Sequence, residues 1–263
     1  MNKTLRTAST GLSAQQKYVE IISNNLANVN TTGFKKVRPE FQDLLYETLR
    51  PAGAIARVGV EPLNEVQIGS GSQLVATTRQ LGNGDLIQTN DDNHLAINGE
   101  GYFIMRKPDN TLAYSRDGSF KLDRDGQMVN TQGFRLDPGI AIPENTIDVE
   151  ITGDGVVNVL LDGEKTEYSS VGQIQLARFI NPAGLKALGD NMFSETPASG
   201  TPFFMIPGEY NTGLLVQGHL EASNVDVVEE MVNMIQAQRA YELNSKAVRT
   251  AESILETAVN LKR

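Results

Sequence analysis

Apolar residues at both ends of the chain recur with helical spacing. Between Thr4 and Val29 they fall seven residues apart, with further apolar positions between them that complete a narrow heptad stripe. A second stripe of this period runs from about Val225 to Leu261, a stretch without glycine or proline. The stripes predict two long helices that pair as a coiled coil, although an amphipathic helix on a globular core gives the same periodicity. The predicted polymerisation seam consists of Leu5, Leu12, Val19, Ile22, Leu26, Met231, Met234, Tyr241, Val248 and Leu255.

The start of the second predicted helix carries the usual end signals. Ser223 and Asn224 offer side-chain oxygens that can cap it. The acidic residues Asp226, Glu229 and Glu230 follow, where the helix dipole favours negative charge. A helix is therefore expected to begin among these residues.

The pattern changes between Gln67 and Leu220, where short β-prone runs alternate with turns. Asp-Gly pairs are strong turn signals because glycine accepts a positive φ and aspartate stabilises the turn. The middle is therefore predicted to be an antiparallel β domain, built as a sandwich or a barrel-like body, and the whole chain to be an α+β fold. The Asp-Gly pairs are Asp117-Gly118, Asp125-Gly126, Asp154-Gly155 and Asp162-Gly163.

The sequence thus divides into four consecutive segments. Residues 1–30 are expected to form the N-terminal helix of a polymerisation core, and residues 223–263 its C-terminal helix. Residues 31–66 contain three prolines and an Ala/Gly-rich stretch, which predicts an extended connector. Residues 67–222 form the predicted β-rich outer domain.

Charge is unevenly distributed along the chain. The net charge is -9, made up of +3 in residues 1–50, -2 in residues 221–263 and -10 between them. An acidic middle between nearly balanced ends suits a solvated body carried by termini that pack against something else. Because nucleic-acid binding needs clustered lysine and arginine, this balance argues against it.

The chain has no cysteine, which excludes disulfides, thiolate metal sites and cysteine nucleophiles. No apolar run at the N-terminus has the length of a signal peptide, and no segment is long and apolar enough for membrane insertion. Export is therefore expected to use a route without a cleaved signal peptide.

Candidate chemistry is sparse. His94 and His219 are the only histidines, too few for a multi-histidine metal site. Asp123, Asp125 and Gly126 faintly resemble a calcium loop, but the glycine comes too early and the closing glutamate is missing, so a hairpin turn is the better interpretation. The sequence therefore predicts no catalytic, cofactor-binding or metal residues. Paired carboxylates of a secreted peptidoglycan hydrolase remain the alternative from a different class, because 32 acidic residues guarantee accidental pairs.

Two separate segments resemble one known family. SNNLANVNTTGFK, from Ser23 to Lys35, is similar to the N-terminal signature of the flagellar rod and hook family, and SNVDVVEEMVNMIQAQRAYELNSKAV, from Ser223 to Val248, to its C-terminal half. The two matches occur in the correct order with a β-rich body between them. The residues that carry the N-terminal motif are Asn24, Asn25, Asn28, Gly33 and Phe34.

Within this family the connector most resembles that of the distal rod branch. The similar stretches are DLLYETLRPAGA, residues 43–54, and QIGSG, residues 67–71. The resemblance implies that a connector from Tyr46 to Val66 braces neighbouring subunits, although its charged residues depart from the more neutral spacer of that branch. The connector residues singled out are Tyr46, Leu49, Pro51 and Gly53.

The resemblance implies a structural subunit rather than an enzyme. Such a subunit assembles with its own copies into a rigid helical tube that transmits motor torque, without a cofactor, nucleic acid or membrane insertion. The implied partners are other flagellar rod proteins, the hook protein, the flagellar type III export apparatus and the bushing rings around the rod. The implied location is the periplasmic rod of the basal body. A proximal rod or hook-type axial protein is the nearest alternative.

Overall fold

A computed structural model describes residues 3–50, 65–162 and 168–260. It has a helix at each end and a strand-rich middle, an α+β fold. The chain forms two compact units that interleave along the sequence. The helical unit contains the described residues of 1–27, 37–78 and 226–263, and the β unit those of 28–36 and 79–225.

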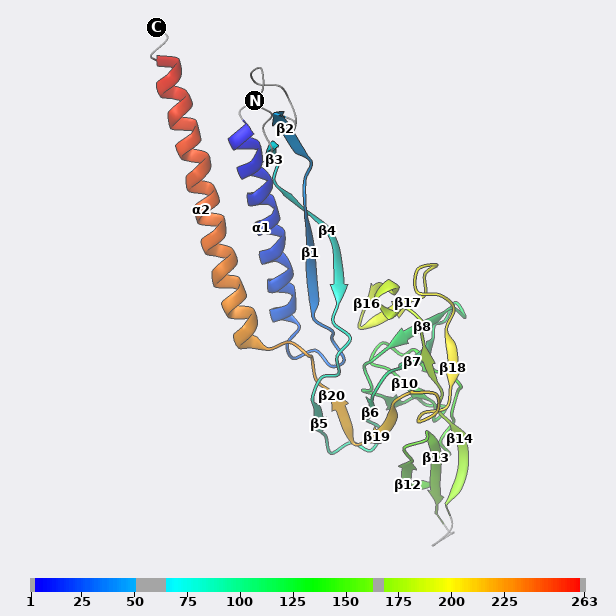
Figure 1. Ribbon diagram of the computed structural model, residues 1–263. Helices are drawn as coiled ribbons and strands as arrows, with labels where there is room; N and C mark the ends of the chain where they lie inside the picture. The colour runs from blue at the N-terminus through cyan, green and yellow to red at the C-terminus, as the bar shows by residue number, and fades with distance from the viewer. Residues whose placement is uncertain (1–2, 51–64, 163–167, 261–263) are drawn as a thin grey trace. The chain divides into compact units, whose positions relative to one another are not determined.

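Two helices dominate the helical unit (Figure 1), α1 (Lys3–Ala27) and α2 (Val227–Asn260). They pack antiparallel, since Asn25 contacts Glu230 near one end and Gly11 lies against Asn244 further along. Neither described helix is long and apolar enough to cross a membrane.

The cap of α2 differs from the predicted one. Asp226 Oδ1 accepts hydrogen bonds from the backbone N–H groups of Val228 and Glu229, at 2.7 and 3.2 Å. The prediction that Ser223 or Asn224 caps this helix is therefore wrong. The physical reason is that a cap oxygen must lie within the turn it caps, and Asp226 directly precedes the first helical residue.

Two antiparallel strand pairs complete the helical unit. One side of α1 packs on β1, where Tyr18 meets Phe41 edge to face with ring centroids 6.2 Å apart. The other pair continues the first as a long ribbon (Figure 1). The pairs are β1 (Val37–Asp43) with β4 (Ser72–Arg79), and β2 (Tyr46–Arg50) with β3 (Val66–Gly69).

A nine-stranded sheet forms the centre of the β unit. Its strands run in the order β16-β17-β8-β7-β11-β10-β9, with β15 also on β7 and β18 on β15. The strands are β7 (Tyr102–Arg106), β8 (Leu112–Ser115), β9 (Lys121–Leu122), β10 (Met128–Val129), β11 (Arg135–Leu136), β15 (Leu176–Arg178), β16 (Lys186–Gly189), β17 (Met192–Ser194) and β18 (Phe203–Met205).

Smaller sheets complete the β unit. One is a three-stranded antiparallel sheet between β11 and β15 in the chain, two others are antiparallel strand pairs, and a 3-10 turn comes before β16. These elements are β12 (Thr146–Ile151), β13 (Val156–Leu161) and β14 (Ser169–Gln173), β6 (Leu95–Asn98) with β19 (Leu214–Gln217), β5 (Leu86–Gln88) with β20 (His219–Glu221), and η1 (Pro182–Gly184).

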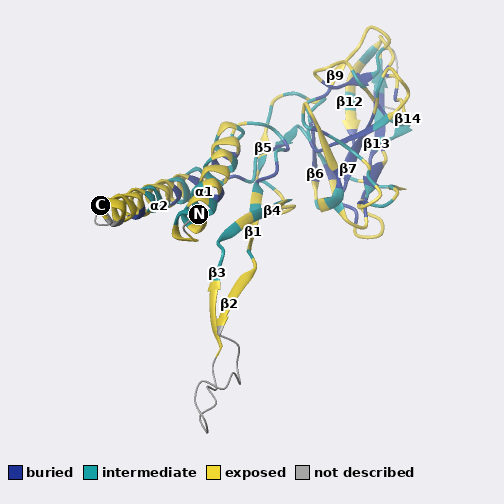
Figure 2. Cartoon of the chain, turned by 90° about the horizontal axis from the view of Figure 1, so that it is seen from above, coloured by how far each residue is buried: buried dark blue, intermediate teal, exposed yellow. Residues whose placement is uncertain are grey.

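The buried core of the chain lies mainly in the β unit, where dark blue strands gather in Figure 2. One cluster of buried side chains includes Leu95, Ile97, Phe103 and Phe120. A second cluster packs around Tyr114, whose pKa burial raises to about 12, with a further contribution from Glu195. This division follows the alternation of side chains along β7 and β8, which sends neighbouring residues to opposite faces.

The predicted Asp-Gly turns have different outcomes. Gly155 joins β12 to β13 with a φ of +83°, and Gly126 turns between β9 and β10 with a φ of +70°, so both turns are confirmed. Gly118 instead allows a close approach, because a Cβ there would lie 1.6 Å from the carbonyl oxygen of Leu95. Gly163 lies outside the described residues.

Candidate functional site

The predicted seam residues of α1 lie on its covered side. Ile22 is fully buried, and the other four are half-buried. The covered side is wider than a single heptad stripe, since Ala14 and Asn25 are buried as well. Helix α1 therefore has neighbours on two sides, α2 on one and β1 on the other.

The seam residues of α2 are covered less evenly. Met234 and Val248 are half-buried, whereas Met231, Tyr241 and Leu255 are 51%, 44% and 37% exposed. The described residues that α2 buries are Glu230 and two small ones, Ala237 and Ala251. Gly11 of α1 approaches so closely that an added Cβ would lie 3.1 Å from Asn244 Nδ2. Close packing of small residues therefore forms much of the α1–α2 contact.

Large apolar side chains of α2 remain exposed on the side away from this contact. They recur every three or four residues in the first turns, which is the spacing of one helix face. We call this face the outer stripe: Val228, Met231, Val232 and Ile235, with exposed fractions of 71%, 51%, 46% and 51%.

The asparagine-rich motif is anchored inside the chain. Asn25 is 1% exposed, and its amide donates to the backbone oxygen of Val37 at 2.9 Å and to Glu230 Oε2 at 3.0 Å. Its Oδ1 accepts from the Val37 N–H at 3.0 Å. Asn25 thus joins the end of α1, the start of β1 and the first turn of α2. Asn24 is exposed, and Asn28 accepts a hydrogen bond from Thr31.

The Gly-Phe pair of the motif belongs to the β unit. Gly33 is buried at a φ of +66°, and its N–H donates to the backbone oxygen of Glu221 at 2.8 Å. A Cβ at Gly33 would lie 2.7 Å from the carbonyl carbon of Arg116, so the position needs glycine for conformation and for space. Phe34 is half-buried beside it.

A buried ion cluster follows directly in the sequence. Lys35 Nζ forms a salt bridge with Glu221 Oε1, and Arg116 lies 3.4 Å from Glu221 Oε2. The three side chains are 2%, 4% and 0% exposed for Lys35, Arg116 and Glu221. Burial lowers the pKa of Lys35, whereas the Glu221 carboxylate acts in the opposite direction. The cluster holds two cations around one carboxylate.

Asn224 ties three backbone segments of the β unit together. Its Oδ1 accepts from the Lys36 N–H at 2.7 Å, and its amide donates to the backbone oxygens of Gln80 and Gly82 at 2.9 and 3.0 Å. Sequence reasoning missed this role and missed the ion cluster. One signal was present, because Glu221 is the only acidic or basic residue, histidine aside, between Glu209 and Asp226. A lone charge in an otherwise uncharged β-prone run indicates a paired, buried group.

The connector residues that the structure describes are exposed. Tyr46 and Leu49 are each 54% exposed, and the neighbouring Leu45 is 90% exposed. The part of the ribbon formed by β2 and β3 contacts α1. Lys3 forms a salt bridge with Glu47 at 2.6 Å, and Arg6 donates a hydrogen bond to Ser70, which follows β3. Pro51 and Gly53 lie outside the described residues.

The residues considered for chemistry have structural partners. His94 Nδ1 lies 2.9 Å from Thr89 Oγ1, and His219 Nδ1 lies 2.8 Å from the backbone oxygen of Gln217. Among the described residues, no group of three His, Cys, Asp or Glu side chains could hold a metal ion.

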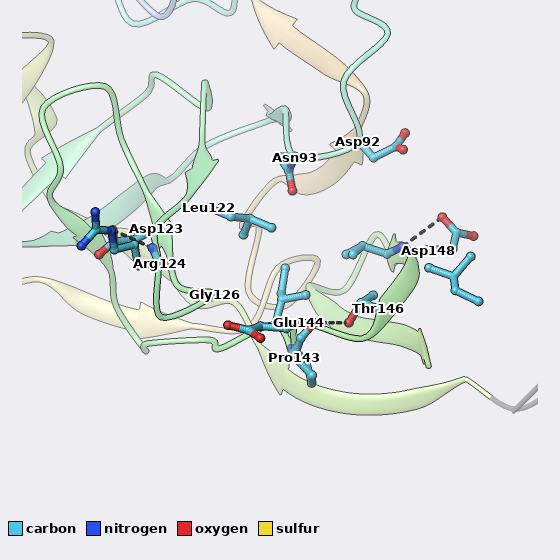
Figure 3. A pocket seen from close by; sticks show the side chains of 13 residues that line it. Asp92, Asn93, Leu122, Asp123, Arg124, Gly126, Pro143, Glu144, Thr146 and Asp148 are labelled. Carbon is cyan, nitrogen blue, oxygen red and sulfur yellow. Dashed lines mark hydrogen bonds between the residues drawn. The ribbon is translucent and has the colours of Figure 1, made fainter. Parts of the chain in front are cut away.

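An open hollow of about 380 Å³ in the β unit is lined by several carboxylates (Figure 3). Asp123 and Asp148 each accept a hydrogen bond from the backbone N–H of the next residue. The Gly126 N–H bonds back to the Asp123 carbonyl, which makes this segment a turn. Two of the carboxylates around the hollow, Asp123 and Asp148, therefore stabilise the local backbone.

Family models match three parts of the chain. A model described as flagella basal body rod protein matches residues 5–35. The FlgE/F/G D1 domain of the flagellar hook protein matches residues 96–159, and the C-terminal part of the flagellar basal body rod FlgEFG protein matches residues 216–261.

Three relatives that match over nearly their whole length carry the same name. The flagellar basal-body rod protein FlgG of Borreliella burgdorferi is 48% identical over 100% of both chains. FlgG of Buchnera aphidicola from Schizaphis graminum is 46% identical over 97% of this chain and 98% of its own, and FlgG of Bacillus subtilis is 37% identical over 100% of both. The flagellar hook protein FlgE of Escherichia coli is 43% identical over 46% of this chain and 29% of its own. The chain that forms these two helices, the anchored motif and the β unit therefore belongs to the FlgG family of flagellar basal-body rod proteins.

Proposed function

We propose that this chain is the structural subunit of the distal part of the flagellar rod, and that its copies assemble into a rigid tube that transmits motor torque to the hook. The family is structural, and it implies assembly with other rod proteins and the hook protein. The proposed location is the periplasmic part of the basal body, reached through the flagellar type III export apparatus without a cleaved signal peptide. The bushing rings around the rod are further proposed partners.

This proposal rests on the apolar side chains that the helical unit leaves exposed to solvent. Val228, Leu243 and Val259 of α2 are 71%, 69% and 65% exposed. The ribbon adds Leu45 at 90%. Exposed apolar surfaces of this kind mark interaction sites, and identical contacts that repeat without closing produce a filament. We propose that copies cover these surfaces and that α1 and α2 supercoil as a coiled coil in the assembly.

Electron microscopy of the concentrated full chain tests the assembly. We expect straight tubes that form above a threshold concentration, together with pelleting of the protein. The same preparation is applied to purified peptidoglycan, where a structural subunit releases no products. Release of wall fragments by a chain that stays monomeric would favour the hydrolase instead.

The distal assignment is tested by removing residues 46–66. This deletion spares both helices and the strands of the β unit, so assembly should persist. Because the ribbon no longer reaches neighbouring copies, we expect a curved or flexible tube. Straight, stiff tubes from the shortened chain would favour a proximal rod or hook-type protein.

A further inference from the structure

The chain passes between the helical unit and the β unit at four points within the part that the structure describes. These crossings follow residues 27, 36, 78 and 225. Domains of one chain are usually joined by a flexible linker with few contacts, so relative motion is their ordinary behaviour. Several crossings can restrict that motion if the crossing segments are bound to one another.

Three of the crossing segments are bound to one another within the β unit. They lie directly before β1, directly after β4 and shortly before α2. Gln80 links the first two, because its N–H donates to the backbone oxygen of Lys36 at 2.9 Å. Ala222 links the last two, because its N–H donates to the backbone oxygen of Asp85 at 2.8 Å. We call the three segments together the junction: residues 34–36, 80–85 and 221–224.

The Asn224 carboxamide bonds to both other segments of the junction at once. Its Oδ1 accepts from the Lys36 N–H at 2.7 Å, and its Nδ2 donates to the backbone oxygens of Gln80 and Gly82 at 2.9 and 3.0 Å. It therefore adds a second link between Gln80 and Lys36, through the Lys36 N–H and the Gln80 carbonyl. This link needs an acceptor and an N–H donor on one planar group, which asparagine and glutamine carry.

The buried ion cluster adds charged hydrogen bonds to the junction. Glu221 accepts from the Gly84 N–H at 3.0 Å, and Lys35 Nζ donates to the Gly82 backbone oxygen at 2.8 Å. The side chains of Lys35 and Glu221 are 2% and 0% exposed, so water competes little for these bonds. Hydrogen bonds to charged groups are also stronger than those between neutral groups. All three segments are therefore held together by several bonds of different kinds.

We propose that Asn224 is a positioning residue that couples the two units of the chain mechanically. The bound segments are continuous with β1, β4 and α2, so a force on one unit loads three chain crossings together. A hinge needs residues that are free to change φ and ψ, and the junction fixes the residues beside these crossings. This inference rests on the proposed function, because a tube that transmits torque requires stiff coupling within each copy.

The variants Asn224→Ala and Asn224→Asp test the coupling in assembled tubes. Alanine loses every bond of the carboxamide, and aspartate has no N–H to donate to the oxygens of Gln80 and Gly82. Both variants should still form tubes, because neither helix carries a substitution. We expect their persistence length, measured by electron microscopy, to fall about threefold or more. Variant tubes as stiff as those of the wild type would overturn the proposal.

A core variant distinguishes coupling from stability of the β unit. Val157 is fully buried on β13, outside the junction. Val157→Ala leaves a cavity in the core, so it should lower the urea midpoint of the β unit at least as much as Asn224→Ala does. Its tubes should nevertheless stay as stiff as those of the wild type. Equal softening by both variants would show that stiffness follows stability and would overturn the positioning role.

Hydrogen exchange of the dilute wild-type chain tests the junction without a substitution. The amides of Lys36, Gln80 and Gly84 should exchange within about tenfold of the rate of the β7 amides, because a bound junction opens only when the β unit unfolds. Faster exchange would overturn the proposal even if the Asn224 variants do not fold. A wild-type chain that forms no tubes would overturn the proposed function, whereas slow exchange at these amides would still show a closed junction.

Discussion

Two residues hold the start of the β unit by different physical means. Gly33 adopts a positive φ and, because it has no Cβ, lets the backbone of Arg116 approach closely. Glu221 contributes a buried negative charge that pairs with Lys35. The sequence motif drew attention to Gly33. It could not reveal the ion cluster, because Glu221 lies 186 residues from Lys35 and nothing in the local pattern pairs them.

Gly33→Ala should destabilise the β unit by more than about 3 kcal/mol, because strain at positive φ adds to a collision with backbone that cannot move aside. Gly133→Ala is the matched control. Its φ is +84° and a Cβ there meets nothing within 4 Å, so only the strain of about 1–2 kcal/mol remains. Urea unfolding followed by circular dichroism measures both. Equal losses would show that the space at Gly33 does not matter.

Glu221→Gln should cost about 3–5 kcal/mol, because it leaves Lys35 and Arg116 buried without a countercharge. The control is Asp125→Asn, which removes an exposed pair with Arg135 and should cost less than about 1 kcal/mol. Adding Lys35→Met to Glu221→Gln should recover part of the loss. A Glu221→Gln variant as stable as the control would contradict the view that the cluster is structurally important.

At the scale of elements, hydrophobic periodicity predicted both helices but not the composition of their contact. Heptad spacing selects large apolar residues such as Tyr241, which is 44% exposed. The contact is instead close and includes Ala237, which is 2% exposed. Periodicity gives the direction of a face and says nothing about the distance between helices. That distance depends on the small residues of both partners, Gly11 included.

Ala237→Leu should therefore hinder assembly more than an added leucine elsewhere on α2. Overpacking a close contact costs about 1–3 kcal/mol, which corresponds to roughly a tenfold higher concentration for tube formation. The exposed neighbour provides the control, Gln238→Leu, which should assemble as the wild type does. Pelleting over a concentration series measures the threshold. Equal thresholds for the two variants would argue against close packing at Ala237.

At the scale of the molecule, the two units draw on segments that are far apart in the chain. The sequence predicts four consecutive segments, because the hydrophobic pattern changes from one stretch of the chain to the next. The compact units of the structure interleave along the chain. Residues 28–36 belong to the β unit, although the next residues, 37–78, belong to the helical unit. Spatial neighbours such as Gly33 and Glu221 follow from packing that no local pattern encodes.

Limited proteolysis of the dilute chain should expose this interleaving. The helical unit leaves much apolar surface uncovered, so we expect its order to depend on assembly and its segments to be cleaved first. The resistant material should contain residues 79–225 and, still bound without a covalent link, residues 28–36. Mass spectrometry under native and denaturing conditions identifies both pieces. Helices that resist cleavage in dilute monomer would show that the helical unit is self-sufficient.

The salt bridge between Lys35 and Glu221 also acts as a check on chain length. A copy that stops before residue 221 lacks the carboxylate for both buried cations, and it lacks all of α2 as well. Such a fragment can complete neither unit. Premature termination should therefore give an unstable chain, and we expect such a copy to be left out of the assembly.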